Sequence, residues 1–381
     1  MKKLRVMTVF GTRPEAIKMA PLVKELAKSE LIDSKVCVTA QHREMLDQVL
    51  EKFNIQPDYD LDIMQQSQTL EQITTRALIG LGEVYEKVKP DIVLVHGDTT
   101  TTFAGSLAAF YKKISAGHVE AGLRTYDKYY PYPEEINRRL TGVLCDYHFA
   151  ATYSNKQNLL NEGYPEEKIY VTGNTVIDTF KYTICDDFRF KDKTLQSLDF
   201  DKKRVITVTA HRRENIGKPL EDICSALKTI ADRYENVHIV YLVHLNPAVR
   251  ETANRILYNH KRVSLIDPVD VQQTHNLMKR SYMVITDSGG LQEEAPSLGT
   301  PVIVARNETE RQEAVEAGTV KLAGTNKNRI IELAQELLED SGEYNKMAKA
   351  VNPYGDGKAS ERIVQAILYE FGLKYEKPVN F

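Results

Sequence analysis

Acidic side chains stand directly after short apolar runs at several places in the first half of the chain. They are Asp98 in HGDT, Glu120 in GHVEAG, and Glu134 with its neighbour Glu135 in PYPEE. Carboxylates that converge on one crevice can act as general acid and general base, because different surroundings shift their pKa values apart. Asp98 and Glu135 also have structural alternatives, as a helix N-cap with Thr99 and as a first-turn acid. Of these carboxylates, Glu120 is the one whose position is least well explained by a purely structural role.

A loop near the N-terminus has residues suited to binding a phosphate. Gly11-Thr12-Arg13-Pro14-Glu15 follows an apolar run, and Gly11 permits a sharp turn before a helix. Arg13 places a cation at the positive end of that helix, and Lys18 adds a second cation one turn later. A solvated helix start explains the loop equally well, since it matches neither of the common glycine-rich phosphate motifs.

The second half of the chain repeats this arrangement. Ser288, Gly289 and Gly290 follow an apolar run and open a helix, so backbone N–H groups and a hydroxyl can close on a diphosphate. Glu294, one turn into the helix, can accept hydrogen bonds from ribose hydroxyls, and Arg311 in the next loop supplies a cation. A plain strand–turn–helix connection is the alternative.

Histidines complete the set of candidate residues. His211 precedes two arginines after an apolar run and can donate to a phosphate or carry a proton, whereas His244 alone is more often a solvated histidine. His118-x-Glu120 is similar to a zinc deaminase signature, but no P-C-x-x-C follows, so we expect no metal site. Two anion sites and a group of carboxylates together predict a nucleotide-linked substrate.

Apolar, β-branched runs alternate with helix-like windows along the chain and must position these residues. One series extends from Arg5–Phe10 to Tyr147–Ala150, and a second from Ile169–Val171 to Val320–Leu322. Near-continuous apolar strands indicate parallel sheets covered on both faces, and the alternation indicates βαβ units. The sequence therefore predicts a doubly wound α/β fold, in which ligands bind beyond the carboxyl ends of the strands.

The length of 381 residues and the two series predict two domains. We expect residues 1–172 to form an N-terminal Rossmann-like domain and residues 173–358 a C-terminal Rossmann-like domain that binds the nucleotide part of the substrate. A helix at about 359–372 is expected to pack back on either half. The polar stretch 185–203 is a linker or a long surface loop, and we favour the loop.

Composition excludes several classes of protein. The formal net charge of −3, from 50 Lys+Arg and 53 Asp+Glu, argues against nucleic-acid or anionic-membrane binding. No run approaches the ~18 apolar residues of a membrane span. The apolar run Val6–Phe10 is too short for a signal peptide, and four well-separated cysteines indicate the reducing cytoplasm.

These motifs occur together, and in an order that resembles the non-hydrolysing UDP-N-acetylglucosamine 2-epimerases. The resemblance covers about Lys3 to Ile367 and rests on GTRPEAIKMAPL, TAQHREMLDQVL, HGDTTTT, GHVEAGLRT, PEEINRR, TGNTVID, HRREN, TDSGGLQEEAPSLG and NPYGDG. It implies a GT-B-like fold, with two Rossmann-like domains of parallel sheets and an active site in the interdomain cleft.

The resemblance also implies an activity and a setting. The expected reaction interconverts UDP-GlcNAc and UDP-ManNAc at C2, by elimination of UDP to a 2-acetamidoglucal and re-addition. The resemblance implies no metal and no cofactor. It implies a cytoplasmic homodimer that supplies cell-surface polysaccharide synthesis.

Residues that match the family's motifs receive expected roles by the same resemblance. Asp98, Glu120 and Glu134 match the acid/base carboxylates, and His211 matches the active-site histidine. The positions that match UDP-binding residues are Arg13, Lys18, Ser288, Gly289, Gly290, Glu294 and Arg311. Thr274 stands where family members commonly carry an aromatic residue near the uracil.

Bacterial members of that family also bind a second UDP-GlcNAc as an activator. Gln41, Arg212 and His244 match this site, while Glu44 and Ser67 replace a Gln and an Arg found in some members.

Alternative functions for the chain are a GT-B glycosyltransferase, a hydrolysing epimerase and a non-catalytic sugar-nucleotide sensor. The sensor is the weakest rival, because carboxylates at three strand ends would repel the phosphates of its ligand.

Overall fold

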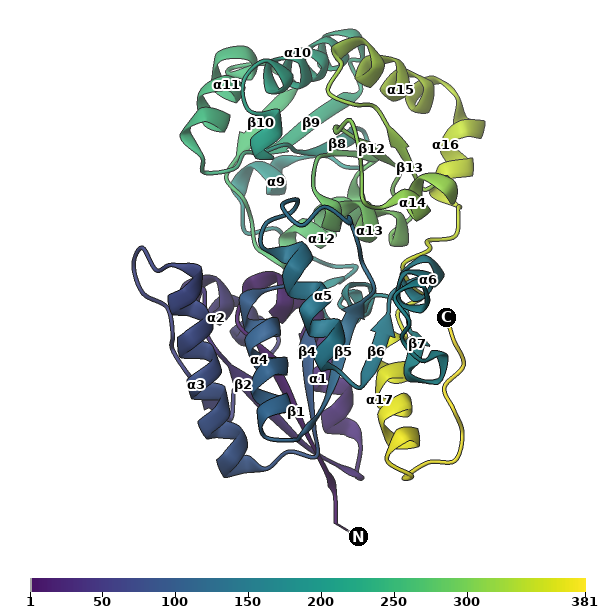
Figure 1. The fold of residues 1–381 in the computed structure, drawn as a ribbon. Coiled ribbons are helices and arrows are strands. Elements are labelled where there is room, and N and C mark those ends of the chain that lie inside the picture. The colour runs from purple at the N-terminus through teal and green to yellow at the C-terminus, as the bar shows by residue number, and fades with distance from the viewer. Residues whose placement is uncertain (1) are drawn as a thin grey trace. The chain divides into compact units, whose positions relative to one another are not determined.

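The computed structural model describes residues 2–381, which divide into two units with one main sheet each (Figure 1). The first unit comprises Met1–Tyr182 and Tyr354–Phe381, and the second comprises Thr183–Pro353. Every strand pairing in both sheets is parallel. The predicted α/β fold with two Rossmann-like domains is therefore confirmed.

The sheet of the first unit has seven strands in the order β3-β2-β1-β4-β5-β6-β7. They are β1 (Leu4–Phe10), β2 (Ile32–Val38), β3 (Tyr59–Asp60), β4 (Ile92–His96), β5 (Ser115–Ala121), β6 (Tyr147–Ala150) and β7 (Ile169–Val171). The order reverses between β1 and β4, and ligands of doubly wound sheets bind beyond the carboxyl ends at such a switch point. The run 169–171 was grouped with the second series of apolar runs, but it pairs with β6 as an edge strand of this sheet, within the residues 1–172 expected for the N-terminal domain.

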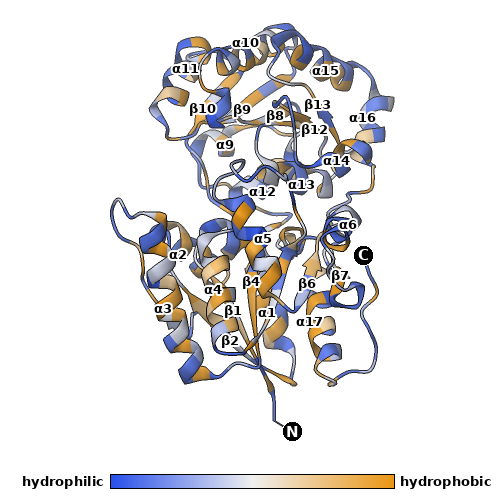
Figure 2. Cartoon of the chain, viewed as in Figure 1, coloured by the Kyte–Doolittle hydropathy of each residue, from blue (hydrophilic) through white to orange (hydrophobic). Residues whose placement is uncertain are grey.

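Helices connect the strands of the first unit, and a helix near the C-terminus of the chain completes it. They are α1 (Arg13–Lys28), α2 (Arg43–Lys52), α3 (Leu70–Val88), α4 (Thr100–Tyr111), α5 (Glu134–Leu144), α6 (Tyr153–Asn161), α7 (Thr175–Asp178), α8 (Phe180–Thr183) and the C-terminal α17 (Ala359–Glu370), with a 3₁₀ turn at Glu166–Lys168. Figure 2 shows β4 in the hydrophobic colour, as expected of a strand buried between helical layers.

The second unit repeats the design with six strands in the order β10-β9-β8-β11-β12-β13. The strands are β8 (Arg204–Thr209), β9 (Val237–Leu242), β10 (Val263–Ile266), β11 (Met283–Thr286), β12 (Val302–Val304) and β13 (Val320–Leu322). The helices are α9 (Lys193–Ser197), α10 (Lys218–Arg233), α11 (Pro247–Leu257), α12 (Val271–Arg280), α13 (Gly289–Ser297), α14 (Gln312–Glu316), α15 (Lys327–Glu339) and α16 (Ser341–Ala348), with a 3₁₀ turn at Arg213–Asn215. Its switch point lies between β8 and β11.

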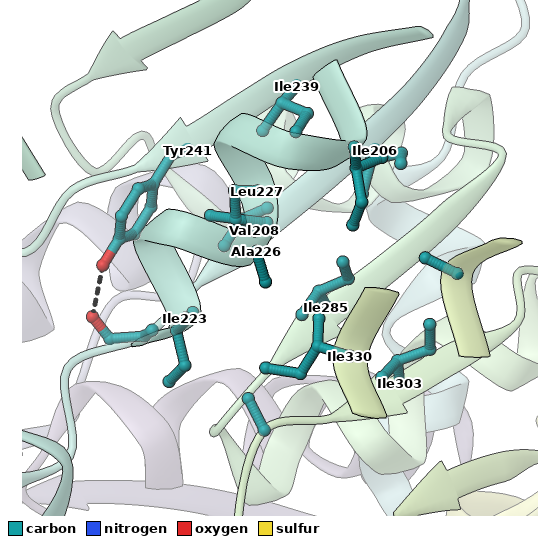
Figure 3. Close-up of a cluster of buried hydrophobic side chains, with 14 of the residues drawn as sticks. Ile206, Val208, Ile223, Ala226, Leu227, Ile239, Tyr241, Ile285, Ile303 and Ile330 are labelled. Carbon is teal, nitrogen blue, oxygen red and sulfur yellow. Dashed lines mark hydrogen bonds between the residues drawn. The ribbon is translucent and has the colours of Figure 1, made fainter. Parts of the chain in front are cut away.

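A buried apolar cluster holds this second switch point in place (Figure 3). Ile206 of β8, Ile239 of β9 and Leu227 of α10 have no exposed surface. The buried Tyr241 hydroxyl donates to the carbonyl of Ala210 at 2.7 Å, so its polar end is satisfied. Since Ala210 immediately precedes His211 in the chain, the core fixes the start of a candidate functional loop.

The two units divide about ten residues later than the expected boundary at 172/173. Helix α7 packs against α1 and α17, and the Thr179 hydroxyl donates to the carbonyl of Ile17 at 3.1 Å. These contacts place residues 173–182 in the first unit. The chain returns to that unit at Tyr354, whose carbonyl accepts from the N–H of Asn174 at 2.6 Å.

The stretch 185–203 is part of the second unit and carries an apolar cluster of its own. Phe190 and Leu195 are 3% and 1% exposed and pack with strands β8 and β9. The surface-loop reading thus fits better than a free linker, although the stretch is more firmly packed than its polar composition suggested. Among the helices that the described residues form, none combines the length and apolar character needed to span a membrane.

Candidate active site

The loop after β1 is organised by a buried carboxylate. Glu15 Oε2 accepts from the backbone N–H groups of Gly11 and Thr12 at 3.1 and 2.8 Å and from the Thr12 hydroxyl at 2.8 Å. Thr12 and Glu15 form a capping box at the start of α1, which satisfies N–H groups that a helix leaves unpaired. Arg13, the first residue of α1, is exposed and puts its guanidinium at the helix N-terminus.

Glu15 also ties this loop to the loop after β4. Its Oε1 accepts from the hydroxyls of Thr99 and Thr102 at 2.8 and 3.2 Å, so one side chain joins both loops of the switch point. Burial raises the pKa of this carboxyl, while the hydrogen bonds from Thr12 and Thr99 act in the opposite direction. This role of Glu15 was not predicted from the sequence, although the T-x-x-E spacing of Thr12 and Glu15 is a recognisable capping signature.

Gly11 is required by the closeness of its neighbours. A Cβ at this position would lie 2.0 Å from Thr39 Oγ1 and 2.6 Å from Thr101 Oγ1, distances that no side chain can occupy. The Thr101 hydroxyl in turn lies 3.2 Å from Oε1 of Gln41, which follows β2. The expected activator residue Gln41 is therefore packed at the carboxyl edge of the first sheet, beside the loop after β1.

Glu120 lies in β5 where the pairing of this strand with β6 is irregular. Its φ of +63° is unusual for a residue other than glycine, and the β5–β6 register shifts between Val119 and Ala121, as at a β-bulge. Its Oε2 pairs with Lys18 Nζ and accepts from Asn174 Nδ2 at 2.8 Å. Bulges next to active sites redirect a side chain, and here the redirected side chain is the candidate acid/base.

Asp98 is held by helix α5. Its carboxylate pairs with Arg138, and its backbone carbonyl accepts from Asn137 Nδ2 at 3.0 Å. Glu135, fully buried on the same helix, accepts from Arg138 Nη1 at 3.1 Å and from the N–H groups of Thr125 and Tyr126 at 3.0 and 3.1 Å. Glu135 therefore positions Arg138 and the loop before α5.

The neighbouring acid Glu134 has a different environment. It is the first residue of α5 and is partly exposed, whereas the Glu135 side chain is 0% exposed. The sequence analysis left open whether the two residues share a role. Their burial separates them, because a carboxylate without solvent access and with three donors already bound has no capacity to meet a substrate.

A buried histidine shows that Asp98, Glu120 and Lys18 lie close together. His96 is 3% exposed, and its Nε2 lies 3.8 Å from Glu120 Oε2. Burial lowers its pKa to about 4, Glu120 and Asp98 act to raise it, and Lys18 acts to lower it. His96 is therefore neutral near pH 7, next to two carboxylates and an ammonium group. His96 could not be predicted as a site residue, because one histidine at a strand end has no distinctive signature.

His211 and Asp287 meet at the switch point of the second unit. Asp287 is fully buried, and its Oδ2 accepts from the backbone N–H groups of His211 and Arg212, each at 2.7 Å, and from Asn215 Nδ2 at 3.0 Å. Its Oδ1 lies 3.6 Å from His211 Nδ1. Burial lowers the pKa of His211, and the Asp287 charge acts to raise it. Asp287, the first residue of the DSGG motif, was not among the predicted site residues.

The expected diphosphate residues gather at the N-terminus of α13. Ser288 is its N-cap, and Gly289 and Gly290 are its first two residues. A Cβ on Gly289 would lie 3.1 Å from Arg311 Cζ, so glycine lets this guanidinium approach the helix. Arg311 is oriented by Glu293, whose Oε1 accepts from its Nε at 2.8 Å and lies 2.7 Å from its Nη2.

The Glu294 carboxylate lies beside Gly290 at the same helix start. A Cβ on Gly290 would lie 3.1 Å from Glu294 Oε1, and the other carboxylate oxygen lies 3.1 Å from His275 Nε2. The Thr183 hydroxyl lies 2.7 Å from Nδ1 of the same ring. Thr274, where an aromatic residue was expected, donates its hydroxyl to the carbonyl of Asp270 within α12, at 3.0 Å.

Two of the expected activator residues lie beside His211. The His244 and His211 rings are stacked, with centroids 4.9 Å apart and an interplanar angle of 9°. Arg212 Nε donates to the carbonyl of Asp287 at 3.3 Å. His244 therefore contacts His211, and Arg212 contacts Asp287, whereas Gln41 belongs to the first unit.

Each unit thus brings together one half of the expected set at the carboxyl ends of its strands. The first unit gathers Lys18, Asp98 and Glu120, with Arg13 and Glu134 at the starts of α1 and α5. The second unit gathers His211, Ser288, Gly289, Gly290, Glu294 and Arg311. The carboxylates of the first unit can donate and accept protons. The start of α13 in the second unit, together with the Arg311 guanidinium, suits a phosphate.

Comparisons with known proteins agree over the whole chain. A family model described as UDP-N-acetylglucosamine 2-epimerase matches residues 24–368. The UDP-N-acetylglucosamine 2-epimerase of Bacillus subtilis (strain 168) is 57% identical over 381 residues, which is 100% of this chain and 99% of that protein. That of Escherichia coli (strain K12) is 56% identical over 371 residues, 96% of this chain and 98% of that protein.

Solved structures give the same result. The crystal structure of UDP-GlcNAc 2-epimerase from Neisseria meningitidis bound to UDP-GlcNAc superposes with a TM-score of 0.88. It is 51% identical and covers 96% of this chain and 100% of its own. With identities above one half over nearly the full length, and with the motif residues gathered as described, the chain belongs to the UDP-N-acetylglucosamine 2-epimerase family, a family of isomerases.

Proposed function

We propose that this protein catalyses the reversible epimerisation of UDP-GlcNAc to UDP-ManNAc at C2 of the sugar. The observation that carries the proposal is the convergence of Glu120, Lys18 and Asp98 around the neutral His96 at one strand edge. Two carboxylates with different cationic partners suit a reaction that removes a proton from one face of a carbon and returns it to the other. The UDP-GlcNAc bound by the Neisseria meningitidis relative supports the choice of substrate.

The reaction is proposed to proceed by elimination and re-addition. The C2 hydrogen has no adjacent carbonyl, so direct deprotonation is difficult. When the C1–O bond to UDP breaks, positive charge develops at C1, and loss of the C2 proton to a carboxylate gives 2-acetamidoglucal and UDP. Proton delivery to the opposite face of C2, with return of the UDP oxygen to C1, gives the epimer. Asp98, Glu120 and Glu134 are the proposed acid/base groups.

Departure of UDP requires stabilisation of its developing charge. We assign this task to the start of α13, to Arg311, and to His211 with its buried partner Asp287. Arg13 and Lys18 are the proposed cations of the first unit, and Glu294 the proposed acceptor for ribose hydroxyls. Lys18 is paired with Glu120, so its charge also acts on a proposed acid/base carboxylate.

A second UDP-GlcNAc is proposed to act as an activator through Gln41, Arg212 and His244. The stacking of His244 on His211 supports this, because a ligand that orders His244 also orders the proposed catalytic ring. The expected kinetic result is a sigmoidal dependence of initial rate on UDP-GlcNAc, which His244→Ala reduces to a hyperbola. A hyperbolic dependence in the unchanged enzyme contradicts the activator.

We further propose a cytoplasmic homodimer that supplies cell-surface polysaccharide synthesis. Large apolar side chains are exposed on three neighbouring helices of the first unit, with Phe110 and Tyr111 of α4 59% and 64% exposed, and Ile79 of α3 and Val143 of α5 59% and 74% exposed. Exposed apolar side chains on adjacent helices favour association. Sedimentation equilibrium giving the mass of one chain at micromolar concentration would refute the dimer.

The activity is tested with UDP-GlcNAc alone in heavy water, followed by proton NMR. Appearance of UDP-ManNAc with deuterium at C2 is the expected result, since the proton removed exchanges with solvent before it returns. Free ManNAc with UDP would indicate hydrolysis instead. UDP release that depends on an added sugar acceptor, without deuterium at C2, would indicate a glycosyltransferase and contradict the proposal.

A further inference from the structure

Glu310 lies in the loop after β12, and its carboxylate contacts several guanidinium groups. Its Oε1 lies 2.6 Å from Arg311 Nη1 and 3.8 Å from Arg212 Nη2, and its Oε2 lies 2.8 Å from Arg306 Nη1. The side chain is 19% exposed, whereas those of Arg306 and Arg311 are 6% and 11% exposed. Glu310 therefore contacts two largely buried guanidinium groups at once, and it shares the neutralisation of Arg311 with Glu293.

The position of this carboxylate is the second observation. A Cβ on Gly289 would lie 3.1 Å from Glu310 Oε1. Gly289 is the first residue of the nine-residue helix α13, where the helix dipole and backbone N–H groups favour an anion. The space that this glycine leaves open is thus filled by the Glu310 carboxylate, at the helix end to which the proposed function assigns a diphosphate.

Charge makes the two anions competitors. Burial acts to raise the pKa of Glu310, but Arg311, Arg306 and Arg212 lower it to about 2, so the carboxylate is ionised at neutral pH. A diphosphate that takes the same guanidinium groups would face this carboxylate at close range, and like charges in a partly buried site repel strongly. Either the carboxylate withdraws or the diphosphate binds with reduced affinity.

We propose that Glu310 is an internal counter-anion that occupies the diphosphate position at α13 in the unliganded protein and is displaced when the nucleotide binds. This inference rests on the proposed function, which places UDP there. Before binding, Glu310 compensates the charge of Arg306 and, together with Glu293, that of Arg311. On release of UDP it returns to them, so it limits the affinity for the nucleotide and favours its departure.

The test is the affinity of Glu310→Gln for UDP, measured by calorimetry at low salt. Removing the competing charge is expected to lower the dissociation constant roughly tenfold, which corresponds to about 1.4 kcal/mol. The gain should shrink at high salt, because ions screen the partly exposed charges. Glu308→Gln is the matched control, since it removes one charge from an exposed position of the same loop and is expected to bind UDP as the unchanged protein does.

The alternative is that Glu310 only orients Arg311. In that case Glu310→Gln binds UDP equally or more weakly, and the inference is wrong while the proposed function stands. If the unchanged protein binds no UDP, both fail. A crystal structure of the unchanged protein with UDP tests the inference without any variant, because it shows whether Glu310 still contacts Arg311. The inference expects the 2.6 Å contact between Glu310 and Arg311 to be broken, and an intact contact beside bound UDP overturns it.

Discussion

At the scale of single residues, the candidate site depends on groups held in unfavourable positions by their neighbours. Glu120 has a left-handed backbone conformation that residues other than glycine and asparagine seldom adopt, and such strain persists only where surrounding contacts enforce it. The pair with Lys18 and the hydrogen bond from Asn174 supply those contacts. A relaxed backbone would aim this side chain elsewhere, so the strain serves to present the carboxylate.

Glu120→Gln is therefore expected to abolish proton transfer while leaving nucleotide binding intact. The amide keeps the shape of the side chain and an oxygen for Asn174, but it cannot take a proton from C2. We expect the rate of deuterium incorporation at C2 to fall roughly 10²- to 10⁴-fold, with little change in the dissociation constant of UDP. Undiminished exchange in heavy water would remove Glu120 from the acid/base assignment.

Asp287 is expected to control the charge of His211. The Asp287 carboxylate is buried, and its Oδ1 lies 3.6 Å from the imidazole, so its negative charge stabilises the imidazolium. Asp287→Asn removes this charge, while the amide oxygen can still accept from the backbone of His211 and Arg212. The pKa of His211, already lowered by burial, should therefore fall further.

Titration of the His211 ring by NMR measures this shift directly, with the signal assigned by its loss in His211→Gln. The alkaline limb of the epimerisation rate should move to lower pH in parallel, if the imidazolium assists the departure of UDP. Asp222→Asn is the control, since Asp222 is paired with Lys218 on α10 of the same unit. An unchanged His211 titration in Asp287→Asn would show that the pair is structural only.

At the scale of elements, the loop after β1 is built so tightly that one methyl group should disrupt it. Gly11→Ala would place a Cβ 2.0 Å from Thr39 Oγ1, so β2 or the loop must shift. Overpacking of this kind costs about 1–3 kcal/mol, and here it also displaces the N–H group that binds Glu15. We expect a lower melting temperature together with a loss of UDP affinity.

The matched control is Gly82→Ala within α3. Nothing lies within 4 Å of a Cβ at that position, and alanine is a better helix former than glycine by about 1 kcal/mol. Gly82→Ala should therefore raise the melting temperature. Gly11→Ala with a melting temperature at or above that of the unchanged protein would mean that the loop has more room than its contacts indicate.

Elements with a clear apolar pattern were predictable from the sequence, and those fixed by tertiary contacts were not. The apolar strands and the helix at 100–111 follow directly from local pattern. Strand β3 has two residues, Tyr59 and Asp60, too few for any periodicity. The T-x-x-E spacing allows the capping contact of Glu15 with Thr12 to be predicted, but its contacts with Thr99 and Thr102, and those of Glu135 with Thr125 and Tyr126, depend on donors outside its own helix that no local sequence rule places there.

At the scale of the whole chain, the first unit is closed by a segment that returns from the far end of the sequence. The Asp178 carboxylate at the end of α7 accepts from the N–H groups of Ala359 and Ser360, at 3.1 and 2.9 Å, and so caps helix α17 from 181 and 182 residues away. Further along, the Phe381 N–H donates to the carbonyl of Val171 at 2.9 Å. The apolar pattern of 360–371 predicted a helix, but it could not identify the sheet that the helix covers.

Asp178→Ala is expected to loosen α17 and the edge of the first sheet while leaving the second unit unchanged. Loss of an N-terminal cap costs about 1 kcal/mol, so amide exchange in the first turns of α17 should accelerate roughly fivefold. Asp340→Ala is the matched control, because Asp340 caps α16 within the second unit through Gly342 and Glu343 at 2.7 and 3.1 Å. Hydrogen-exchange mass spectrometry should find the two effects in separate units, because each cap serves the unit in which it lies. Faster exchange in α13 and α15 after Asp178→Ala would instead mean that the returning segment stabilises both units, and that the chain does not divide as its contacts indicate.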